Sequence, residues 1–325
     1  MKILILRFSS IGDIVLTTPV IRCLKKQLPN AEIHYATKNT FKSILENNPY
    51  VDKVHVLSTS TTELINELKL EKFDVVIDLH KNIRTLKIKW ALKAKSYSFD
   101  KLNIQKWLFV NWKFKTMPDK HIVDRYLETM HTLGIKNDGG GLDYFIPKKD
   151  IIDLASLPDV YRSKGYVAIA IGAQHATKRL PETKLKELIK KISLPILLLG
   201  GKEDTPMGDI LVSHFSASKN ILNTCGTYNL NQSASLVEQS NYLYTHDTGL
   251  MHIAAALKKR IISIWGNTVP EFGMYPYKTE YVLWQVQDLS CRPCSKIGFN
   301  TCPKKHFKCM NEQILPVHEI EDIWS

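Results

Sequence analysis

The segment from Thr245 to Ala256 places an acid and several small residues directly after an apolar strand. It reads Thr-His-Asp-Thr-Gly-Leu-Met-His-Ile-Ala-Ala-Ala and opens a helix. Because the amides at a helix start attract anions, Thr248 and Gly249 are predicted to bind a diphosphate. The Asp247 carboxylate would repel phosphate and suits hydrogen bonds to sugar hydroxyls instead. The alternative role for Asp247 is that of a plain helix N-cap.

A second acid, Asp13, follows the first apolar strand in the sequence Ser-Ser-Ile-Gly-Asp. One glycine is too few for a dinucleotide-binding loop, which has three. Either Asp13 complements the dipole of a helix that Ser10 caps, or it is a general base toward an acceptor hydroxyl. A helix start lowers the pKa of a carboxyl, whereas nearby phosphates and exclusion of water raise it. The strength of this base stays open.

Two further charged residues lie in loops after predicted strands of the second half. A cation at Lys178 would offset the charge that develops on a departing diphosphate. A lysine in a polar loop is, however, usually only solvated. An acid at Glu203 suits the hydroxyls of a ribose, and a surface turn explains it nearly as well.

The runs that must position these residues alternate between strands rich in Ile, Val and Leu and amphipathic helices. This order is typical of parallel sheets covered on both faces. Predicted strands of the first half are 2–8, 32–36, 53–57, 73–78 and 96–99, and its predicted helices are 14–28, 40–47, 61–70, 83–92 and 122–133. In the second half the predicted strands are 166–171, 195–199, 242–246 and 260–264, with helices 181–192, 205–215, 230–239 and 249–257.

The chain of 325 residues is longer than one compact core usually holds. We therefore expect an α/β protein of two doubly wound, Rossmann-like domains facing each other across a cleft. The predicted boundaries are 1–155 for the first domain and 160–325 for the second. Ligands of such sheets bind beyond the carboxyl ends of the strands, so functional loops should follow strands.

The net charge of +12 is concentrated in residues 81–120, where eleven Lys or Arg face two acids. One basic surface is implied, and it could face nucleic acid, anionic lipid or a phosphorylated sugar. No nucleic-acid-binding motif accompanies the charge, so no nucleic-acid partner is expected. Aromatic and basic residues alternate in 101–115, which suits an anionic membrane surface. The alternative is that Trp107, Leu108 and Phe114 are core residues.

No apolar run is long enough to span a membrane, and the start of the chain predicts a buried strand rather than a secretory signal. The expected location is therefore the cytoplasm. Cys23 and Cys225 lie in apolar surroundings and are expected in the core. The other four cysteines either bind a structural zinc or are free thiols. These are Cys291, Cys294, Cys302 and Cys309. The spacing of the first pair is that of a zinc knuckle, but the second pair is more widely spaced than in a standard zinc ribbon.

The Ser-x-Gly-Asp loop, a lysine after the first strand of the second domain, and Asp-Thr-Gly-Leu-x-His followed by alanines together resemble glycosyltransferase family 9. The best-known members of that family are the lipopolysaccharide heptosyltransferases. The resemblance covers essentially the whole chain. It implies a GT-B fold, an ADP-heptose-like donor, inversion at the anomeric carbon, and neither a cofactor nor a catalytic metal.

The same resemblance implies roles for individual residues. The domain 1–155 would bind the acceptor, the domain 160–325 would bind the nucleotide sugar, and Asp13 would be the catalytic base. The donor-binding residues would be Lys178, Glu203, Asp247, Thr248 and Gly249, and the acceptor-binding residues would be Lys81, Arg84 and Lys87. The family commonly has threonines where this chain has Ala173 and Gln174, so the donor sugar stays open.

The expected function is inverting transfer of a heptose, or a related sugar, from an ADP-sugar to the inner core of a lipopolysaccharide or another lipid A-linked acceptor. Such an acceptor is anionic and lipid-linked, so peripheral contact with the cytoplasmic face of the inner membrane is expected. The alternatives are a GT-B transferase of another nucleotide sugar, a nucleotide-sugar epimerase, and an inactive lipid-binding scaffold.

Overall fold

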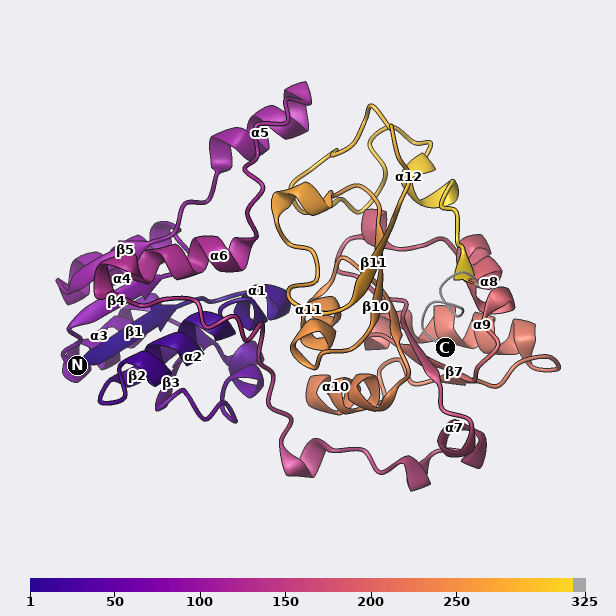
Figure 1. Cartoon of the computed structure of the whole chain (residues 1–325), viewed down its shortest axis with the longest axis horizontal. Coiled ribbons are helices and arrows are strands. Elements are labelled where there is room, and N and C mark those ends of the chain that lie inside the picture. The colour runs from indigo at the N-terminus through magenta and orange to yellow at the C-terminus, as the bar shows by residue number, and fades with distance from the viewer. Residues whose placement is uncertain (318–325) are drawn as a thin grey trace. The chain divides into compact units, whose positions relative to one another are not determined.

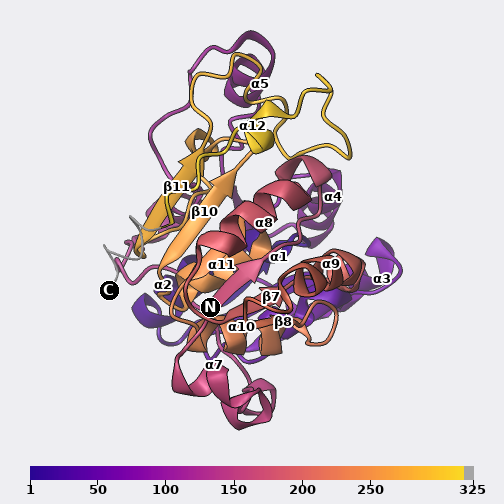
Figure 2. The ribbon, with the colours of Figure 1, turned by 90° about the vertical axis from the view of Figure 1, so that its right-hand side faces the viewer.

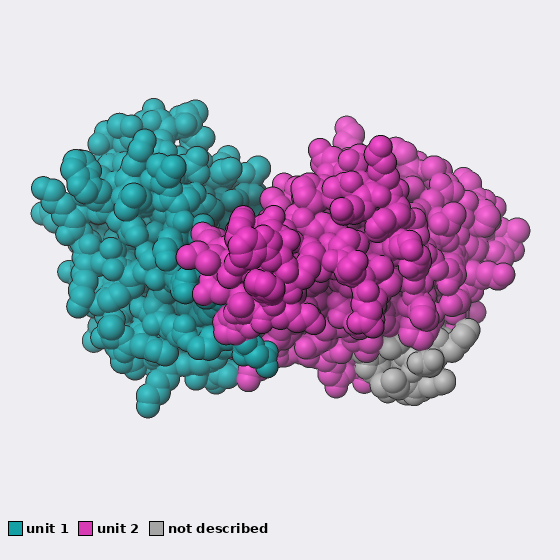
Figure 3. Space-filling view, turned by 90° about the horizontal axis from the view of Figure 1, so that it is seen from above, with its two compact units in different colours: residues 1–102, 119–147 teal, residues 103–118, 148–325 magenta. Residues whose placement is uncertain are grey.

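The computed structural model describes residues 1–317, which fall into two compact units (Figures 1 and 3). Unit 1 comprises Met1–Leu102 and Asp119–Pro147, and unit 2 comprises Asn103–Pro118 together with the chain from Lys148 onward. The domain boundaries at 1–155 and 160–325 remain a prediction. The units differ from them chiefly in residues 103–118, which group with unit 2.

Unit 1 contains a five-stranded parallel sheet in the order β3-β2-β1-β4-β5. Its strands are β1 (Lys2–Leu6), β2 (Glu32–Lys38), β3 (Lys53–Leu57), β4 (Val75–Asp78) and β5 (Lys95–Ser98). Its helices are α1 (Ile11–Val15), α2 (Thr18–Gln27), α3 (Thr61–Glu71), α4 (Ile83–Leu92) and α6 (Ile122–Leu127), with 3-10 segments η1 (Asn39–Ile44) and η2 (Glu128–Leu133).

The single helix predicted over 14–28 is wrong, because the chain forms α1 and α2 with a break between them. Pro19 lacks an amide proton and is tolerated only near the start of a helix. The hydroxyls of Thr17 and Thr18 turn back to the carbonyls of Ile14 and Val15 at 2.7 and 2.8 Å, which satisfies the last acceptors of α1.

Unit 2 contains a six-stranded parallel sheet in the order β11-β10-β9-β6-β7-β8. Its strands are β6 (Val167–Ala170), β7 (Ile196–Leu199), β8 (Ile221–Asn223), β9 (Leu243–His246), β10 (Ile261–Trp265) and β11 (Tyr281–Gln285). Its helices are α5 (Asn103–Trp112), α7 (Asp159–Ser163), α8 (Glu182–Lys191), α9 (Thr205–Phe215), α10 (Leu230–Gln239), α11 (Gly249–Ala256) and α12 (Lys308–Asn311). Short 3-10 segments are η3 (Lys148–Asp150), η4 (Leu154–Ser156), η5 (Ala176–Lys178), η6 (Lys202–Asp204) and η7 (Pro270–Phe272).

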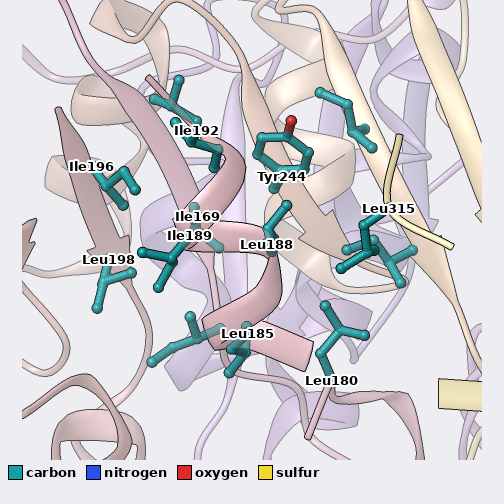
Figure 4. Close-up of a cluster of buried hydrophobic side chains, with 14 of the residues drawn as sticks. Ile169, Leu180, Leu185, Leu188, Ile189, Ile192, Ile196, Leu198, Tyr244 and Leu315 are labelled. Carbon is teal, nitrogen blue, oxygen red and sulfur yellow. The ribbon is translucent and has the colours of Figure 1, made fainter. Parts of the chain in front are cut away.

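Helix α8 shows why these elements form and pack. Figure 2 shows the ribbon of α8 among the elements of unit 2. The apolar residues Leu185, Leu188 and Ile189 of this helix recur at helical spacing and are buried against Ile169 and Tyr244 of the sheet (Figure 4). Burial of each large aliphatic side chain stabilises the fold by about 2 kcal/mol. This packing fixes the strands whose carboxyl ends carry the site described below.

The two parallel sheets confirm the predicted α/β fold class. Among residues 1–317, none of the helices has the length and apolar character needed to cross a membrane.

Candidate functional site

Each sheet has one point where the chain reverses the direction in which it adds strands. In unit 1 this point lies between β1 and β4, and in unit 2 it lies between β6 and β9. The loops after such a pair of strands diverge, and ligands of open α/β sheets bind in the crevice that results. Asp13 follows β1, Lys178 follows β6, and Asp247 follows β9. All three predicted residues therefore lie at a switch point of their own sheet.

The Asp13 carboxylate is held by groups of its own loop. Its Oδ2 accepts hydrogen bonds from the Ser10 amide at 3.1 Å and the Ser10 hydroxyl at 2.7 Å. Its Oδ1 lies 2.5 Å from Nη2 of Arg7, which is 8% exposed. Arg7 in turn donates to the carbonyls of Ser9 and Leu79 and to the Tyr126 hydroxyl. Asp13 is thus a capping residue as well as a positioned carboxylate, so both roles predicted for it are compatible.

The pKa of Asp13 lies below its ordinary value. Burial alone would raise it, but the Arg7 charge and the two Ser10 hydrogen bonds outweigh burial. The carboxylate is therefore ionised at neutral pH and can accept a proton, although the same contacts weaken it as a base.

His80 follows β4 on the other side of this switch point. Its ring packs edge-on against Phe8 with centroids 5.9 Å apart. Burial, together with Arg7 and Lys101, lowers the pKa of His80 to about 4, so the ring is neutral at neutral pH. Its buried Nδ1 has no hydrogen-bond partner.

The predicted acceptor-binding residues lie at or beyond the carboxyl end of β4. The Arg84 guanidinium lies 5.6 Å from the centroid of the Phe8 ring, which brings it to the loop that follows β1. The exposed Lys81 has its amide bonded to Asp78 Oδ1 at 2.7 Å. Lys87 is exposed on α4, one turn beyond Arg84. Of the three, Arg84 is the one whose charge contacts the loop between β1 and Asp13.

In unit 2 the Lys178 ammonium lies 2.6 Å from Asp247 Oδ2 and 3.2 Å from the Asp247 carbonyl oxygen. The Thr268 hydroxyl donates to the same Oδ2 at 2.9 Å. The Lys178 and Asp247 side chains are 15% and 12% exposed. A partly buried ion pair at the sheet edge thus joins the loops after β6, β9 and β10.

Helix α11 begins immediately after this ion pair. Its N-cap is Thr248 rather than Asp247, and the Thr248 side chain makes no capping hydrogen bond. The Thr248 hydroxyl lies 3.3 Å from that of Thr245 instead. No acid occupies the first turn of α11. A helix start with neither an acid nor a side-chain cap favours an anion. That Thr248 and Gly249 bind one stays a prediction.

His246, the last residue of β9, contacts the loop that follows β6. Its Nε2 accepts a hydrogen bond from the Leu180 amide at 3.0 Å, which places the ring proton on Nδ1. Burial lowers the pKa of His246 to about 4. A neutral histidine thus fixes the chain two residues beyond Lys178.

Glu203 is exposed in η6, and its carboxylate folds over Gly201. The buried acid of this turn is the next residue, Asp204, which pairs with Arg179 at 3.0 Å. A side chain at Gly172 would meet Asp204 Oδ2 at 2.0 Å, so glycine is required for the loop after β6 to approach this turn.

Sequence reasoning missed several partners of the predicted residues. Arg7 stands out as a charge at the end of an apolar run, which is a signal that could have been used. Arg179 and Asp204 each adjoin a predicted residue. Thr268 carries no local signal, because its proximity to Asp247 arises only when β9 and β10 pair.

Side-chain exposure decides between a core and a surface position for the aromatic residues of 101–115. Trp107 and Phe114 are 47% and 56% exposed, so they are surface residues. Phe109 is the buried residue of α5 and joins Val269 and Phe272, with the partly buried Val110 packed against them. Cys23 and Cys225 are buried, as expected of core residues.

A pair of parallel α/β sheets with polar residues gathered at their switch points is the architecture of GT-B glycosyltransferases, and comparison with known proteins identifies this class. The family model for glycosyltransferase family 9 (heptosyltransferase) matches residues 61–305, and the chain belongs to that family. It is therefore a glycosyltransferase. The match includes Lys178, Glu203 and Asp247, whereas Asp13 precedes it.

Relatives agree with this assignment. The chain is 25% identical over 300 residues to lipopolysaccharide heptosyltransferase 1 of Campylobacter coli, covering 82% of this chain and 84% of the relative. A glycosyl transferase family 9 structure from Veillonella parvula superposes with a TM-score of 0.72 at 21% identity, over 87% of this chain and 85% of that one. The E. coli heptosyltransferase WaaC with ADP-2-deoxy-2-fluoro heptose gives a TM-score of 0.66 at 22% identity, over 87% and 93%.

Proposed function

We propose that this glycosyltransferase moves a heptose from ADP-heptose to the inner core of a lipid A-linked, lipopolysaccharide-type acceptor. The observation that carries the proposal is the Lys178–Asp247 ion pair beside the open start of α11, in a chain of family 9. The name of the Campylobacter relative and the sugar nucleotide held by WaaC support the choice of acceptor and donor.

The donor diphosphate would lie at the start of α11. The amides of Thr248 and Gly249 suit its oxygens, and Lys178 supplies the matching cation. Asp247, which already accepts hydrogen bonds from Lys178 and Thr268, would bind hydroxyls of the sugar. The exposed Glu203 carboxylate would accept hydrogen bonds from the ribose.

In the proposed reaction the Asp13 carboxylate takes the proton of an acceptor hydroxyl. The oxygen then attacks the anomeric carbon on the face opposite the diphosphate, so the configuration at that carbon inverts. The bond from the anomeric carbon to the diphosphate oxygen breaks, and ADP leaves. Lys178 and the α11 amides stabilise the charge that grows on the diphosphate. A nucleoside diphosphate leaves well without a general acid.

The acceptor would bind through its anionic groups to Lys81, Arg84 and Lys87. We further propose that α5 and the segment after it rest on an anionic membrane surface at the cytoplasmic face. Their exposed apolar side chains, together with neighbouring lysines, suit that surface. These side chains are Ile104, Trp107, Trp112 and Phe114. A flotation assay with anionic vesicles tests this contact. The wild-type protein should float with the vesicles, and the double variant Trp107→Ser and Trp112→Ser should not.

The test of the reaction combines the enzyme, ADP-heptose and an inner-core acceptor that lacks the heptose. Mass spectrometry should show an acceptor heavier by one heptose and free ADP. NMR of the product should show an anomeric configuration opposite to that of the donor. An isomerised free sugar nucleotide would instead indicate an epimerase, and extension from UDP-sugars alone would indicate another transferase.

A further inference from the structure

The segment between β11 and α12 has an unusual construction. It runs from Val286 to Phe307 without a helix or strand and carries three thiols, and a fourth, Cys309, follows inside α12. Long connections without regular structure are uncommon in compact domains, and small apolar contacts alone rarely order them. The apolar residues of this segment at the unit 2 core are Leu289 and Phe307.

The four thiols gather in space as well as in sequence. The thiol of Cys294 interacts with that of Cys291 and, through space, with that of Cys302. The thiol of Cys309 lies within electrostatic range of all three others. The Cys294 thiol also donates to the Cys291 carbonyl at 3.0 Å. Within residues 1–317, no three of these sulfurs lie within 4.8 Å of one another, so a shared ion would have to draw them together.

Two cations lie beside this thiol cluster, defined as Cys291, Cys294, Cys302 and Cys309. The Lys113 ammonium donates to the carbonyls of Pro293 at 2.7 Å and Cys291 at 3.3 Å. The Arg292 guanidinium is within electrostatic range of the cluster and donates to main-chain carbonyls. Four thiolates around a divalent ion carry a net charge of −2, which these two cations would balance.

We propose that the thiol cluster binds one divalent soft metal ion, zinc or iron, as a closed structural site. Four sulfur ligands suit either ion in tetrahedral geometry, and the Cys-x2-Cys pair has the spacing of a knuckle. Binding displaces the four thiol protons to solvent and changes no oxidation state. The free energy of binding orders the segment in place of an apolar core.

The segment matters because it supports the proposed donor site. The amide of Phe299 donates to the Thr177 hydroxyl at 2.8 Å, and the Thr177 amide donates to the Phe299 carbonyl at 3.1 Å. Thr177 directly precedes Lys178. On the other side, Arg292 donates to the Thr268 carbonyl at 2.9 Å. The metal would thus hold two of the loops that position Asp247, and this consequence rests on the proposed function.

The metal itself is tested without reference to the reaction. Protein purified without chelators is expected to contain about one zinc or iron per chain by elemental analysis. The double variant Cys291→Ser and Cys294→Ser should lose it, whereas Cys23→Ser, at a buried cysteine outside the cluster, should keep it. Cobalt substitution should give the thiolate-to-metal absorption of a tetrahedral sulfur site in wild type and in Cys23→Ser, but not in the double variant.

A measurement on the wild-type chain avoids dependence on how the variants fold. Four thiols should be protected from a thiol reagent until a strong chelator is added, and the melting temperature should fall on chelation. Absence of metal, or intramolecular disulfides by mass spectrometry, would overturn the proposal. So would metal retained by a folded Cys291→Ser and Cys294→Ser protein, which would point to another site such as His34, His55 and Glu71.

The link to the donor site has its own readout. Chelation should weaken ADP binding by about tenfold, the scale expected when one contact that orders a loop is lost. If the protein contains the metal but its ADP affinity is unchanged after chelation, the metal site is supported and its link to the donor site is excluded. Bound metal in a protein that binds no adenine nucleotide at all would instead contradict the proposed function.

Discussion

The ammonium of Lys178 lies 2.6 Å from Asp247 Oδ2 and also reaches the Asp247 main-chain oxygen at 3.2 Å. These two contacts use two of the three protons of the ammonium, so one remains for a phosphate oxygen. With the donor bound as proposed, Lys178 would contact both Asp247 and the diphosphate, and the Lys178–Asp247 ion pair would stay intact.

Replacement of Lys178 by Met should weaken donor binding by about a hundredfold, because the diphosphate loses its cation and Asp247 is left as a partly buried charge without that partner. Calorimetry with ADP measures the affinity. Lys186→Met, at a surface lysine of α8 that pairs with Glu182, is the matched control and should bind ADP normally. Equal ADP affinity in the two variants would contradict the role of Lys178.

Thr268→Val removes the hydroxyl that donates to Asp247 and keeps the shape of the side chain. The loss of one hydrogen bond to a charged group is worth about 1.5 kcal/mol, so affinity for the intact sugar nucleotide should fall about tenfold. Affinity for ADP alone should change less, since Asp247 is assigned to the sugar. Thr279→Val, which removes a hydroxyl that donates to the main-chain carbonyl of Lys259, controls for the substitution. An equal loss of affinity for ADP and for the sugar nucleotide would indicate that Asp247 acts at the diphosphate and not at the sugar.

Asp13→Asn should reduce kcat by about 10² to 10⁴, the usual contribution of a general base, and leave ADP affinity unchanged. The exposed Asp119, changed to Asn, is the control. Because Arg7 and Ser10 lower the pKa of Asp13, the base form persists below pH 3.8 and is lost only as the pH falls through that lowered value. A loss of kcat near pH 6 in wild type must therefore come from another group. Full activity of Asp13→Asn would exclude Asp13 as the base.

Burial gives His246 a pH signature in folding. Its pKa is about 4 in the folded chain against 6.5 ordinarily, so between these values the unfolded chain binds a proton that the folded chain does not. The free energy of unfolding should thus fall as the pH drops from 6.5 to 4, by about 3 kcal/mol from this group. His80 adds to the same trend.

Denaturant titrations at pH 7 and pH 5 measure the trend. The variant His246→Gln keeps an acceptor for the Leu180 amide and should show a shallower pH dependence. His306→Gln, at an exposed histidine, should behave as wild type. An unchanged slope in His246→Gln would show that His246 is not the group responsible.

The sequence was sufficient for the parts of the fold that depend on local pattern. The helices at Ile83–Leu92, Thr205–Phe215 and Leu230–Gln239 have the predicted bounds, because each has a clear start and apolar spacing. The short strand β8, the strand β11 and helix α5 were not predicted. β8 has only three residues, and α5 buries just Phe109 on one side, so neither has a strong periodic signal.

The site divides in the same way. Asp13, Lys178 and Asp247 could be found because each follows a strand, and the carboxyl ends of parallel strands share one edge of the sheet. Their partners Arg7 and Thr268 could not be paired with them from the sequence, since these contacts depend on loop conformation and on which strands are neighbours. The N-cap of α11 is a similar case: the alternative role predicted for Asp247 was that of the N-cap, but Thr248 occupies this position.

Binding of an ADP-sugar at the Lys178–Asp247 site is tested most directly by a thermal-shift panel of ADP-, UDP- and GDP-sugars. A donor present at a hundred times its dissociation constant stabilises the folded chain by about 2.7 kcal/mol. ADP-heptose should raise the melting temperature of wild type and of Lys186→Met, and should raise that of Lys178→Met much less. Stabilisation by uridine or guanosine donors but not by ADP-heptose, or an equal shift in Lys178→Met, would contradict the account.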